Sequence, residues 1–439
     1  MEKYLGNKRV LLDDIYNFCL QNSPDAKSIY DAFSGTTNVA RMFQKKGFSV
    51  FANDINRFSY VLGQTYLCLP KYPDFQNIKI NQVNDEFGLE ARFFSDVRRD
   101  GGALFDDDKS EHVFKKLRSS LSVFAYLNSL NEMKEGDDYH ILNNYTESGE
   151  CSYYKSLRGT EGYRNYFSRE NAVLIDNMLH QVRLWYRSGV LDNSEVFYLL
   201  TAILEEVVLN ANVSGTFHDF NRKKLWPNSL QRFYLKIPLA SVSKTTGHMF
   251  NGDALQVSGV IPEHDVLYID PPYNFRQYTS YYHLLNFIAI YPFLDDVNEY
   301  LSGITYVRGQ REDDDFASDF CFKDRFIGAL DALISQSKCK YVVMSYYGGR
   351  NHWNHWSKEE NHTDVGFNIL EEYFSRDKFC SHSSTSVTKL RMNYQSRVGE
   401  KKSIIDEYLF FAKKVDEDSI KEYRPRERAS GFILFDDIL

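Results

Sequence analysis

The sequence predicts an α/β protein built on a mostly parallel sheet. In two stretches, one near the N-terminus and one in the second half of the chain, short apolar runs alternate with amphipathic segments. This alternation is typical of parallel sheets, in which a helix connects one strand to the next. A long, helix-rich polar stretch separates them, and 439 residues exceed one ordinary core. We therefore expect one sheet domain that carries a large insertion.

The first alternating stretch begins at residue 28. The run SIYDAF at 28–33 predicts a short buried strand, and SGTTN after it predicts a turn. The segment VARMFQKKG at 39–47 predicts a helix that ends at Gly47, because glycine commonly ends helices. The run FSVFAND at 48–54 predicts a second strand that ends in an acid. Together these elements form one strand–helix–strand unit.

The same alternation returns from residue 265. DVLYID at 265–270, KYVVMSYY at 340–347 and DEYLFFAKK at 406–414 predict strands. YTSYYHLLNFIAIY at 278–291 and DRFIGALDALISQS at 324–337 predict helices. We therefore expect both stretches to belong to one sheet domain.

The stretch between them has a different character. Residues 171–189 and 193–212 predict helices, whereas the polar residues 134–152 predict a loop. The end of the chain is charged, with a small apolar terminus. The predicted division is a sheet domain at 1–74 and 246–414, a largely helical insertion at 75–245 and a C-terminal tail at 415–439.

Charge and cysteine content narrow the classes of protein. There are 52 lysines and arginines against 60 acidic residues, a net charge of −8, whereas generic polyanion binders are usually basic. Any nucleic-acid surface must therefore be local. The six cysteines are scattered without a C-x-x-C pair, which argues against a zinc ribbon or a disulfide framework and suits a reducing cytoplasm. Neither a signal peptide nor a membrane span is expected.

The turn after the first strand is a candidate nucleoside site. A glycine-containing turn between a parallel strand and a helix forms a crevice at the strand's carboxyl end, and Gly35 lets a ligand approach the backbone. Asp54 ends the next strand about 20 residues further on, where an acid commonly binds ribose hydroxyls. The turn does not match G-x-G-x-x-G, which favours a nucleoside without a pyrophosphate. An ordinary loop with a surface aspartate is the alternative.

The sequence Asp270-Pro271-Pro272-Tyr273 is a candidate catalytic tetrad. Two prolines stop the strand and fix the backbone, because proline cannot donate to a sheet ladder. They hold the Asp270 carboxylate beside the Pro271 carbonyl, and these two acceptors suit an amino group with two hydrogens. Tyr273 offers a flat face for a planar ring. The tetrad therefore indicates a site for adenine or cytosine.

The chemistry of such an amine indicates a methyl transfer. Its lone pair is delocalised into the ring, and hydrogen bonds to both hydrogens make the nitrogen more pyramidal and more nucleophilic. The natural electrophile is the sulfonium methyl of S-adenosylmethionine, held at the first motif. Positioning and oriented dipoles would supply the catalysis, with no metal and no covalent intermediate.

The tetrad and DAFSG at 31–35 together resemble the amino-methyltransferases of DNA, specifically the Dam-like adenine class. The motif order matches that family's alpha arrangement, with the cofactor motif first, a recognition insertion next and the tetrad last. The resemblance covers most of the chain. It implies a Rossmann-like methyltransferase sheet, S-adenosylmethionine as cofactor and an adenine flipped out of duplex DNA as substrate.

The resemblance also implies roles for individual segments. YLGNKRVLL at 4–12 is similar to a motif in which an aromatic residue and a lysine contact the cofactor, and NGDAL at 251–255 to one that contacts its adenine. VVMSYYGG at 342–349 resembles a strand beside the target-base pocket. Thr37 stands where the family often has a second glycine, which leaves the loop geometry open. The residues implied to bind the cofactor are Tyr4, Lys8, Asp31, Phe33, Gly35, Asp54, Asp253 and Asp270.

The stretch 210–236 concentrates positive charge and aromatic rings within an acidic protein. Such a surface suits phosphates, and in Dam-like enzymes a similar G-x-[FY] segment packs on DNA. A second basic run lies at 389–402. A solvated helix face is the alternative. The residues predicted to contact DNA are Phe217, Arg222, Lys223, Lys224, Arg232 and Arg397.

Two further stretches predict no chemistry. His352 and His355 in NHWNHW are three residues apart, with His362 beyond, but no neighbouring pattern of cysteines or acids completes a metal site. The acidic run REDDDF at 311–316 predicts a solvated loop.

Three alternatives to an adenine-specific DNA methyltransferase stay open. The first is the same reaction on cytosine, on adenine in RNA or on a protein glutamine, although Asp270 favours adenine and the insertion favours duplex DNA. The others are a DNA-binding regulator with a vestigial cofactor pocket and a dinucleotide oxidoreductase. The resemblance suggests a monomer, alone or with a partner restriction endonuclease, and the recognised DNA sequence stays open.

Overall fold

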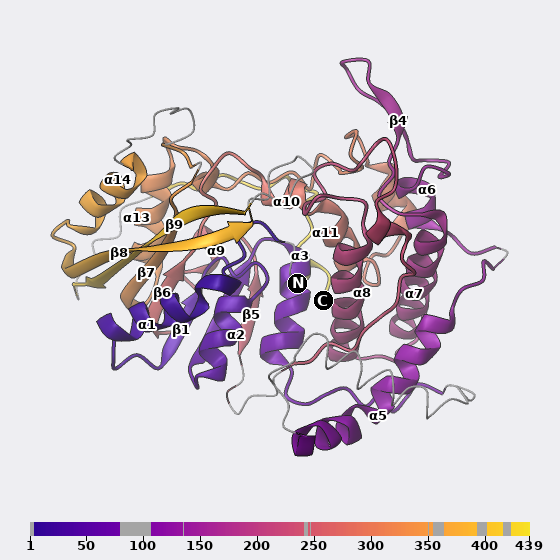
Figure 1. Cartoon of the computed structure of the whole chain (residues 1–439), viewed down its shortest axis with the longest axis horizontal. Helices are drawn as coiled ribbons and strands as arrows, with labels where there is room; N and C mark the ends of the chain where they lie inside the picture. Colours follow the sequence, from indigo (N-terminus) through magenta and orange to yellow (C-terminus); the bar gives the residue numbers. More distant parts are fainter. Residues whose placement is uncertain are drawn as a thin grey trace.

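The computed structural model has the predicted α/β architecture. A seven-stranded sheet with helices on both faces lies beside a group of long helices (Figure 1). The described residues are 4–79, 107–134, 136–240, 245, 247–349, 351–353, 364–392, 402–415 and 423–439. None of the described helices is long and apolar enough to cross a membrane.

The sheet has the strand order β5-β2-β1-β6-β7-β9-β8. The first five strands in this order are parallel, and β9 runs antiparallel between β7 and β8. The predicted mostly parallel sheet is therefore confirmed. The bounds are β1 Ser28–Asp31, β2 Ser49–Asp54, β5 His248–Asn251, β6 His264–Ile269, β7 Cys339–Tyr347, β8 Phe379–Met392 and β9 Lys402–Lys414.

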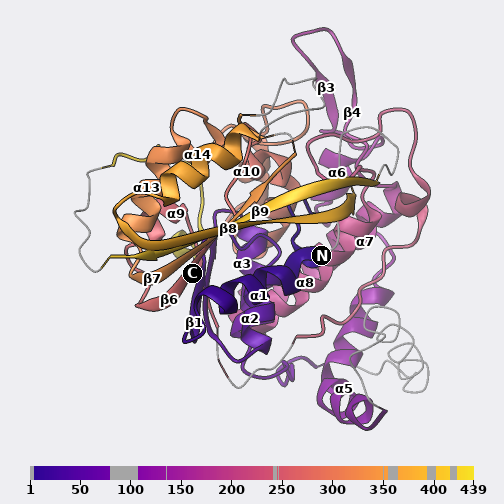
Figure 2. The ribbon, with the colours of Figure 1, turned by 60° about the vertical axis from the view of Figure 1, so that its left-hand side comes forward.

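Helices cover both faces of the sheet because both faces are apolar. In β6, Val266 and Tyr268 pack with α1 and α2 on one face, whereas Leu267 and Ile269 pack with α9, α13 and α14 on the other. Figure 2 shows these two layers with the sheet between them. Alternation of side chains along the strand thus feeds two separate cores. The bounds are α1 Leu12–Asn22, α2 Asn38–Lys45, α9 Ala254–Val257, α13 Phe326–Gln336 and α14 Val365–Phe374.

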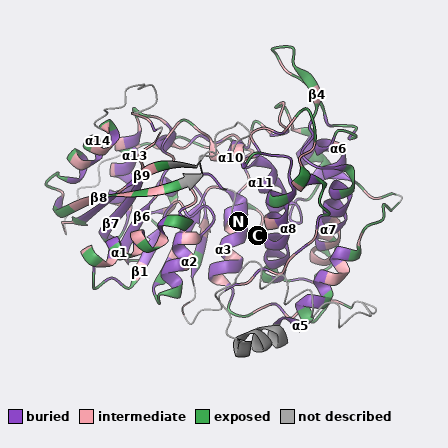
Figure 3. Ribbon diagram, viewed as in Figure 1, coloured by how far each residue is buried: buried purple, intermediate pink, exposed green. Residues whose placement is uncertain are grey.

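The long helices share one core with part of the sheet domain. α7 begins after Ser168, whose hydroxyl accepts from Asn171 N, and α8 begins at an Asp192–Glu195 capping box. Their buried faces pack with α3 and α11 in one cluster, and Figure 3 shows the resulting buried residues along α3, α7 and α8. The bounds are α3 Arg57–Gly63, η2 Gln64–Cys68, α5 Asp107–Ser129, α6 His140–Tyr145, α7 Arg169–Arg187, α8 Asn193–Asn210, α10 Tyr278–Tyr281, α11 His283–Ile290 and α12 Val297–Ser302.

Several local predictions differ from the structure. The predicted helix at 278–291 is broken at Tyr282 into α10 and α11, and the Tyr282 hydroxyl accepts from Leu5 N. The predicted loop at 134–152 contains α6, whose side chains are mostly buried. The serine-rich strand β8 was not predicted, because it is stabilised by pairing with β9 rather than by an apolar pattern. Neither was the projecting hairpin of β3, Tyr153–Lys155, and β4, Glu161–Tyr163 (Figure 1).

The end of the chain is part of the core rather than a free charged tail. Residues 423–439 include the short helix η5, Phe435–Asp437. Phe435 is fully buried and packs against the rings of Tyr60, Phe197 and Phe293. Figure 1 places the C-terminus between the sheet and the long helices. The apolar residues of GFILF therefore outweigh the neighbouring charges in deciding where this segment lies.

Candidate active site

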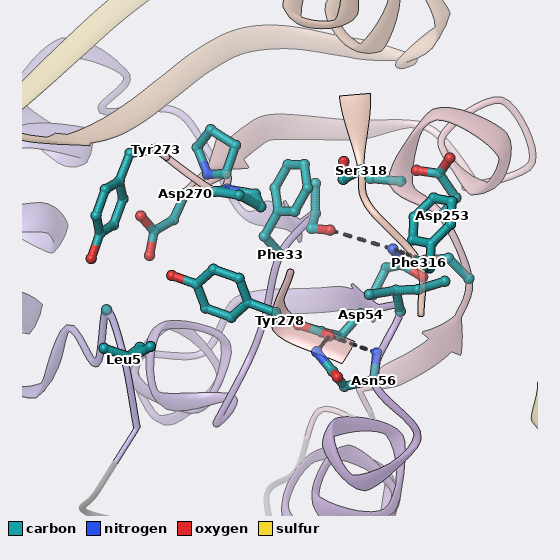
Figure 4. A pocket seen from close by; sticks show the side chains of 18 of the residues that line it. Leu5, Phe33, Asp54, Asn56, Asp253, Asp270, Tyr273, Tyr278, Phe316 and Ser318 are labelled. Carbon is teal, nitrogen blue, oxygen red and sulfur yellow. Dashed lines mark hydrogen bonds between the residues drawn. The ribbon is translucent and has the colours of Figure 1, made fainter. Parts of the chain in front are cut away.

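A cleft opens where the carboxyl ends of β1, β2 and β6 meet. Parallel strands place their carboxyl ends at one edge of the sheet, so the loops that follow them converge there. Figure 4 shows Asp270 and Tyr273 at one end of the cleft, Asp253, Phe316 and Ser318 at the other, and Phe33 and Tyr278 between them. The lining residues are Tyr4, Leu5, Gly6, Ala32, Phe33, Asn53, Asp54, Ile55, Asn56, Gly252, Asp253, Ala254, Asp270, Pro271, Pro272, Tyr273, Tyr278, Phe316 and Ser318.

Asp270 is the first residue after β6, and its carboxylate is 16% exposed. Pro271 and Pro272 follow without a cis peptide bond and line the cleft beside it. Tyr273 is 9% exposed and stacks on Tyr347 at the end of β7, with ring centroids 4.8 Å apart and an interplanar angle of 27°. The structure thus brings the predicted tetrad together, and Tyr347 covers one face of the Tyr273 ring.

Lys8 joins two carboxylates next to the tetrad. Its Nζ lies 2.8 Å from Asp270 Oδ1 and 2.8 Å from Glu407 Oε1. The Lys8 side chain is 4% exposed and Glu407 is fully buried. Lys8 itself is not among the lining residues of the cleft. It therefore acts on the cleft through Asp270, and the sequence had given no role to Glu407.

The turn after β1 has the tight geometry that its glycine permits. Gly35 has φ +49°, and a Cβ there would lie 2.8 Å from the Tyr4 ring. Thr37 has φ +62°, a conformation that a β-branched residue adopts at a cost of about 1–2 kcal/mol. The chain therefore keeps a glycine-like turn where threonine stands. Tyr4 packs over this turn and stacks on Tyr282 at 4.8 Å.

Asp54 is the last residue of β2 and is 7% exposed. Its Oδ2 accepts from Gly35 N at 2.8 Å, and its Oδ1 accepts from Asn56 N at 2.8 Å and Asn56 Nδ2 at 2.9 Å. Burial raises the Asp54 pKa, and these hydrogen bonds oppose the rise. A carboxylate accepts about four hydrogen bonds, so three donors leave room for a ligand hydroxyl.

Asp253 forms the far wall of the cleft. It caps α9 by accepting from Leu255 N at 3.2 Å, and it is 4% exposed. Burial raises the Asp253 pKa to about 6. Phe316 and Ser318, which also line this end, come from a segment for which the sequence predicted no site.

A family model described as D12 class N6 adenine-specific DNA methyltransferase matches residues 4–298. The chain belongs to this family. The match confirms the resemblance predicted from the tetrad and the first motif, and with it a family of DNA-modifying enzymes.

The chain is also similar to proteins named as methylases or methyltransferases. Modification methylase LlaI of Lactococcus lactis subsp. lactis is 27% identical over 422 residues, 94% of this chain and 55% of the relative. Type II methyltransferase M.FokI of Planomicrobium okeanokoites is 27% identical over 348 residues, 78% of this chain and 44% of the relative. Type II methyltransferase M.NlaIII of Neisseria lactamica is 26% identical over 349 residues, 78% and 82% respectively. The chain spans about half the length of the first two relatives.

Asp31 is one of three predicted cofactor residues of this D12-class chain, with Lys8 and Gly35, that do not line the cleft. It is 1% exposed and does not line the cleft. Burial and the nearby carboxylates of Asp270 and Asp54 raise the Asp31 pKa to about 8. Asp31 is therefore not positioned to contact a ligand in the cleft directly. Gly35 also lies outside the lining, and it reaches the cleft through its bond to Asp54.

The acidic run at 311–316 is solvated only in part, since Glu312 is exposed whereas Asp314 and Phe316 are buried. Asp314 is buried and lies 2.7 Å from Arg57 Nη2 at the start of α3. Burial alone would raise the Asp314 pKa, but Arg57 holds it below its usual value. Phe316 ends the run in the cleft wall. The charges of the sequence therefore suggested solvent where the fold places a buried ion pair.

The residues predicted to contact DNA separate into surface and core. Lys223 and Lys224 are exposed, and Arg222 donates to the Tyr154 hydroxyl at 3.0 Å and to Asp219 at 2.9 Å. Arg232 is also exposed and donates to Asn128 O at 3.0 Å. Arg397 lies outside the described residues.

Phe217 is a core residue and not a surface one. It is 1% exposed, and its ring stacks on Tyr166 with centroids 6.1 Å apart. Its backbone N–H donates to the carbonyl of Tyr281 in α10 at 2.8 Å. The predicted DNA contact is thus not available to Phe217, which instead joins the insertion to the segment after the tetrad.

His352 packs against aromatic rings. Its ring centroid lies 5.3 Å from Phe326 and 5.7 Å from Trp353, and burial lowers the His352 pKa to about 4. His355 and His362 lie outside the described residues. Within the described ranges, no three histidines, cysteines or acids come together as a metal site.

Proposed function

We propose that this protein transfers the methyl group of S-adenosylmethionine to the exocyclic amino group of an adenine flipped out of a specific duplex DNA sequence. One observation carries the proposal, namely that the carboxylate of Asp270 opens into the same cleft as Asp54 and Asp253. A cofactor and a target base held in this cleft would meet at the tetrad. Membership of the D12 class supports adenine as the target.

The walls of the cleft fit the cofactor. Asp54 can accept hydrogen bonds from ribose hydroxyls. Asp253 offers a carboxylate at the other end of the cleft for the adenine moiety. Phe33 and Phe316 provide apolar surface between and beside these acids. Tyr4 and Leu5 close the cleft from the N-terminal segment. These acceptors and apolar surfaces thus match a nucleoside that carries a methylsulfonium group.

When bound, S-adenosylmethionine supplies an electrophilic methyl group. The chain's own residues prepare the nucleophile, since the Asp270 carboxylate and the Pro271 carbonyl accept the two hydrogens of the amino group. The free face of Tyr273 stacks against the base. Formation of the N–CH3 bond would break the S–CH3 bond of the cofactor and leave S-adenosylhomocysteine, and the Asp270 carboxylate would receive the surplus proton of the amino nitrogen.

The insertion at 75–245 would serve DNA recognition beside the catalytic domain of 1–74 and 246–414. Arg222, Lys223, Lys224 and Arg232 would contact phosphates, joined by Arg397 from the catalytic domain. The segment 415–439, at least where it is described, would brace the two parts. Relatives named modification methylases and type II methyltransferases support a role beside a restriction endonuclease.

Long-read sequencing of DNA from a host without adenine methylation, expressing this chain, tests the proposal. We expect methyladenine at nearly every copy of one short motif, and none with Asp270→Ala, because that variant loses the acceptor for the amine. Methylation that persists in Asp270→Ala would contradict the mechanism.

Other results would select an alternative. Methylcytosine in place of methyladenine would identify cytosine as the target base. Methylation of RNA or protein in cell extracts would identify that molecule, rather than DNA, as the substrate. A folded chain that binds DNA but not S-adenosylmethionine, measured by calorimetry, would favour a DNA-binding regulator.

A further inference from the structure

Glu407 is a buried carboxylate that the chemistry above does not use. It lies in β9, is fully buried and accepts a hydrogen bond from the Ser345 hydroxyl of β7. The Lys8 ammonium lies 2.8 Å from Glu407 and 2.8 Å from Asp270. A fully buried acid is rare without a strong reason for its position, because its charge loses the hydration of water.

The sheet register places Glu407 beside Tyr347, which stacks on Tyr273 of the tetrad. Glu407 and Tyr347 pair directly across β7 and β9. Lys8 belongs to the N-terminal segment whose Tyr4 and Leu5 line the cleft. The three charged groups therefore join the antiparallel strand, the N-terminal segment and the tetrad at one point.

The ion pair between Lys8 and Asp270 competes with the proposed reaction. Asp270 accepts the hydrogens of the target amine only with oxygens that Lys8 does not hold. A buried ammonium without a carboxylate would be costly, so Lys8 needs another partner whenever Asp270 turns to the base. Glu407, also 2.8 Å from the Lys8 ammonium, provides that partner.

We propose that Glu407 is a positioning residue of the methyl transfer, which anchors Lys8 so that the Asp270 carboxylate can accept the target amine. This inference rests on the proposed function. The local charge supports the proposed role of Glu407. The carboxylates of Glu407 and Asp270 together with the Lys8 ammonium carry a net charge of one negative unit. Removing Glu407 leaves a neutral Lys8–Asp270 pair, and removing Lys8 leaves the buried Glu407 carboxylate near the Asp270 carboxylate without a cation between them.

The test compares single-turnover methylation of DNA by wild type, Glu407→Gln, Lys8→Met and the double variant. We expect Glu407→Gln to lower the rate by about 100-fold, as a misplaced catalytic group does. Cofactor affinity should stay unchanged, because Glu407 does not line the cleft. The double variant should be faster than either single variant, because it restores one negative charge and frees Asp270 from Lys8.

Two further variants separate positioning from folding. Glu407→Asp keeps the charge and should retain most of the rate even if Glu407→Gln folds poorly. Asp331→Asn removes another carboxylate paired with a lysine, 2.6 Å from Lys378 and away from the cleft, and should leave the rate unchanged. Thermal unfolding and calorimetry with S-adenosylmethionine accompany every variant.

The outcomes are distinct. A double variant no faster than Glu407→Gln, or a Glu407→Gln rate within a few-fold of an active wild type, overturns the role of Glu407 and leaves the proposed function standing. Loss of cofactor affinity in step with loss of rate also overturns it, since the residue would then support the fold of the cleft. A wild type that methylates no DNA overturns the proposed function and this inference with it.

Discussion

At the scale of single residues, Asp54 and Asp270 were predictable as acids of the cleft because each stands at the end of a strand, whereas Asp253, which caps α9, was predicted only from the family resemblance. Asp54 and Asp270 follow apolar runs, and the carboxyl ends of parallel strands meet at one edge. Leu5 and Phe316 were not predictable, since their approach to the cleft depends on how distant segments pack. Asp31 ends a strand as Asp54 does, yet Asp31 does not line the cleft. No local sequence pattern distinguishes the two positions.

Asp253 gives a prediction about pH. Its folded-state pKa of about 6 is raised by burial above the ordinary 3.8, so its contribution to stability is greatest at low pH and is lost as the pH rises towards 6. If the ionised carboxylate binds the cofactor, the dissociation constant should rise by up to about tenfold per pH unit below pH 6. Calorimetry between pH 5 and 8 measures this dependence.

Two variants control the pH experiment. Asp253→Asn should weaken binding at pH 7.5 and remove the change near pH 6. Asp265→Asn alters an acid at the opposite end of β6, outside the cleft, and should keep the change. The same pH dependence in Asp253→Asn as in wild type would assign the titration to another group.

At the scale of elements, the apolar periodicity predicted the strands and helices whose own side-chain pattern shows which face is buried. It failed where contacts between distant segments decide the structure. α10 and α11 separate at Tyr282, whose hydroxyl accepts from Leu5 N, and β8 is held by its pairing with β9. The C-terminal segment was read from its charges, whereas Phe435 and its neighbours decide its place.

This segment also contacts the proposed cofactor site. Phe435 N donates to Asn251 Oδ1 at 3.1 Å, and Asn251 Nδ2 donates to Asp54 O at 2.8 Å. We expect Phe435→Ala to lower the free energy of unfolding by about 3–5 kcal/mol and to weaken cofactor binding, because it opens a cavity beside this chain of bonds. Denaturant unfolding and calorimetry measure the two effects.

The matched control is Leu439→Ala, which truncates an apolar residue of the same segment that is 51% exposed. It should change both quantities little. Equal effects of the two substitutions would mean that the segment contributes through general packing rather than through Phe435.

At the scale of the whole molecule, the sequence predicted a sheet domain with a helical insertion but not the core that joins them. α3 and α11 of the sheet domain pack with α7 and α8 of the insertion in one cluster. The hydrogen bond from Phe217 N to the Tyr281 carbonyl adds a link near the tetrad. If the insertion binds DNA as proposed, this shared core keeps the bound DNA at a fixed distance from the cleft.

The last prediction concerns the charge that would hold DNA on an acidic protein. Lys223 and Lys224 are exposed on the insertion. If each contacts one phosphate, replacing both with alanine should reduce the slope of log affinity against log salt by about 2, since each contact contributes about 0.9. Affinity should fall alike for cognate and unrelated duplexes, because phosphate contacts carry no sequence information. Cofactor affinity should not change.

Lys340→Ala provides the matched control for this experiment. Lys340 is 66% exposed and lies near the amino end of β7, at the edge of the sheet opposite the cleft. Fluorescence anisotropy with labelled duplexes between 50 and 300 mM salt, roughly the range over which such contacts are screened, measures the slopes. If the double variant keeps the wild-type slope, Lys223 and Lys224 do not contact phosphates and the DNA-binding surface lies elsewhere. The same conclusion follows if Lys340→Ala reduces the slope as much as the double variant does.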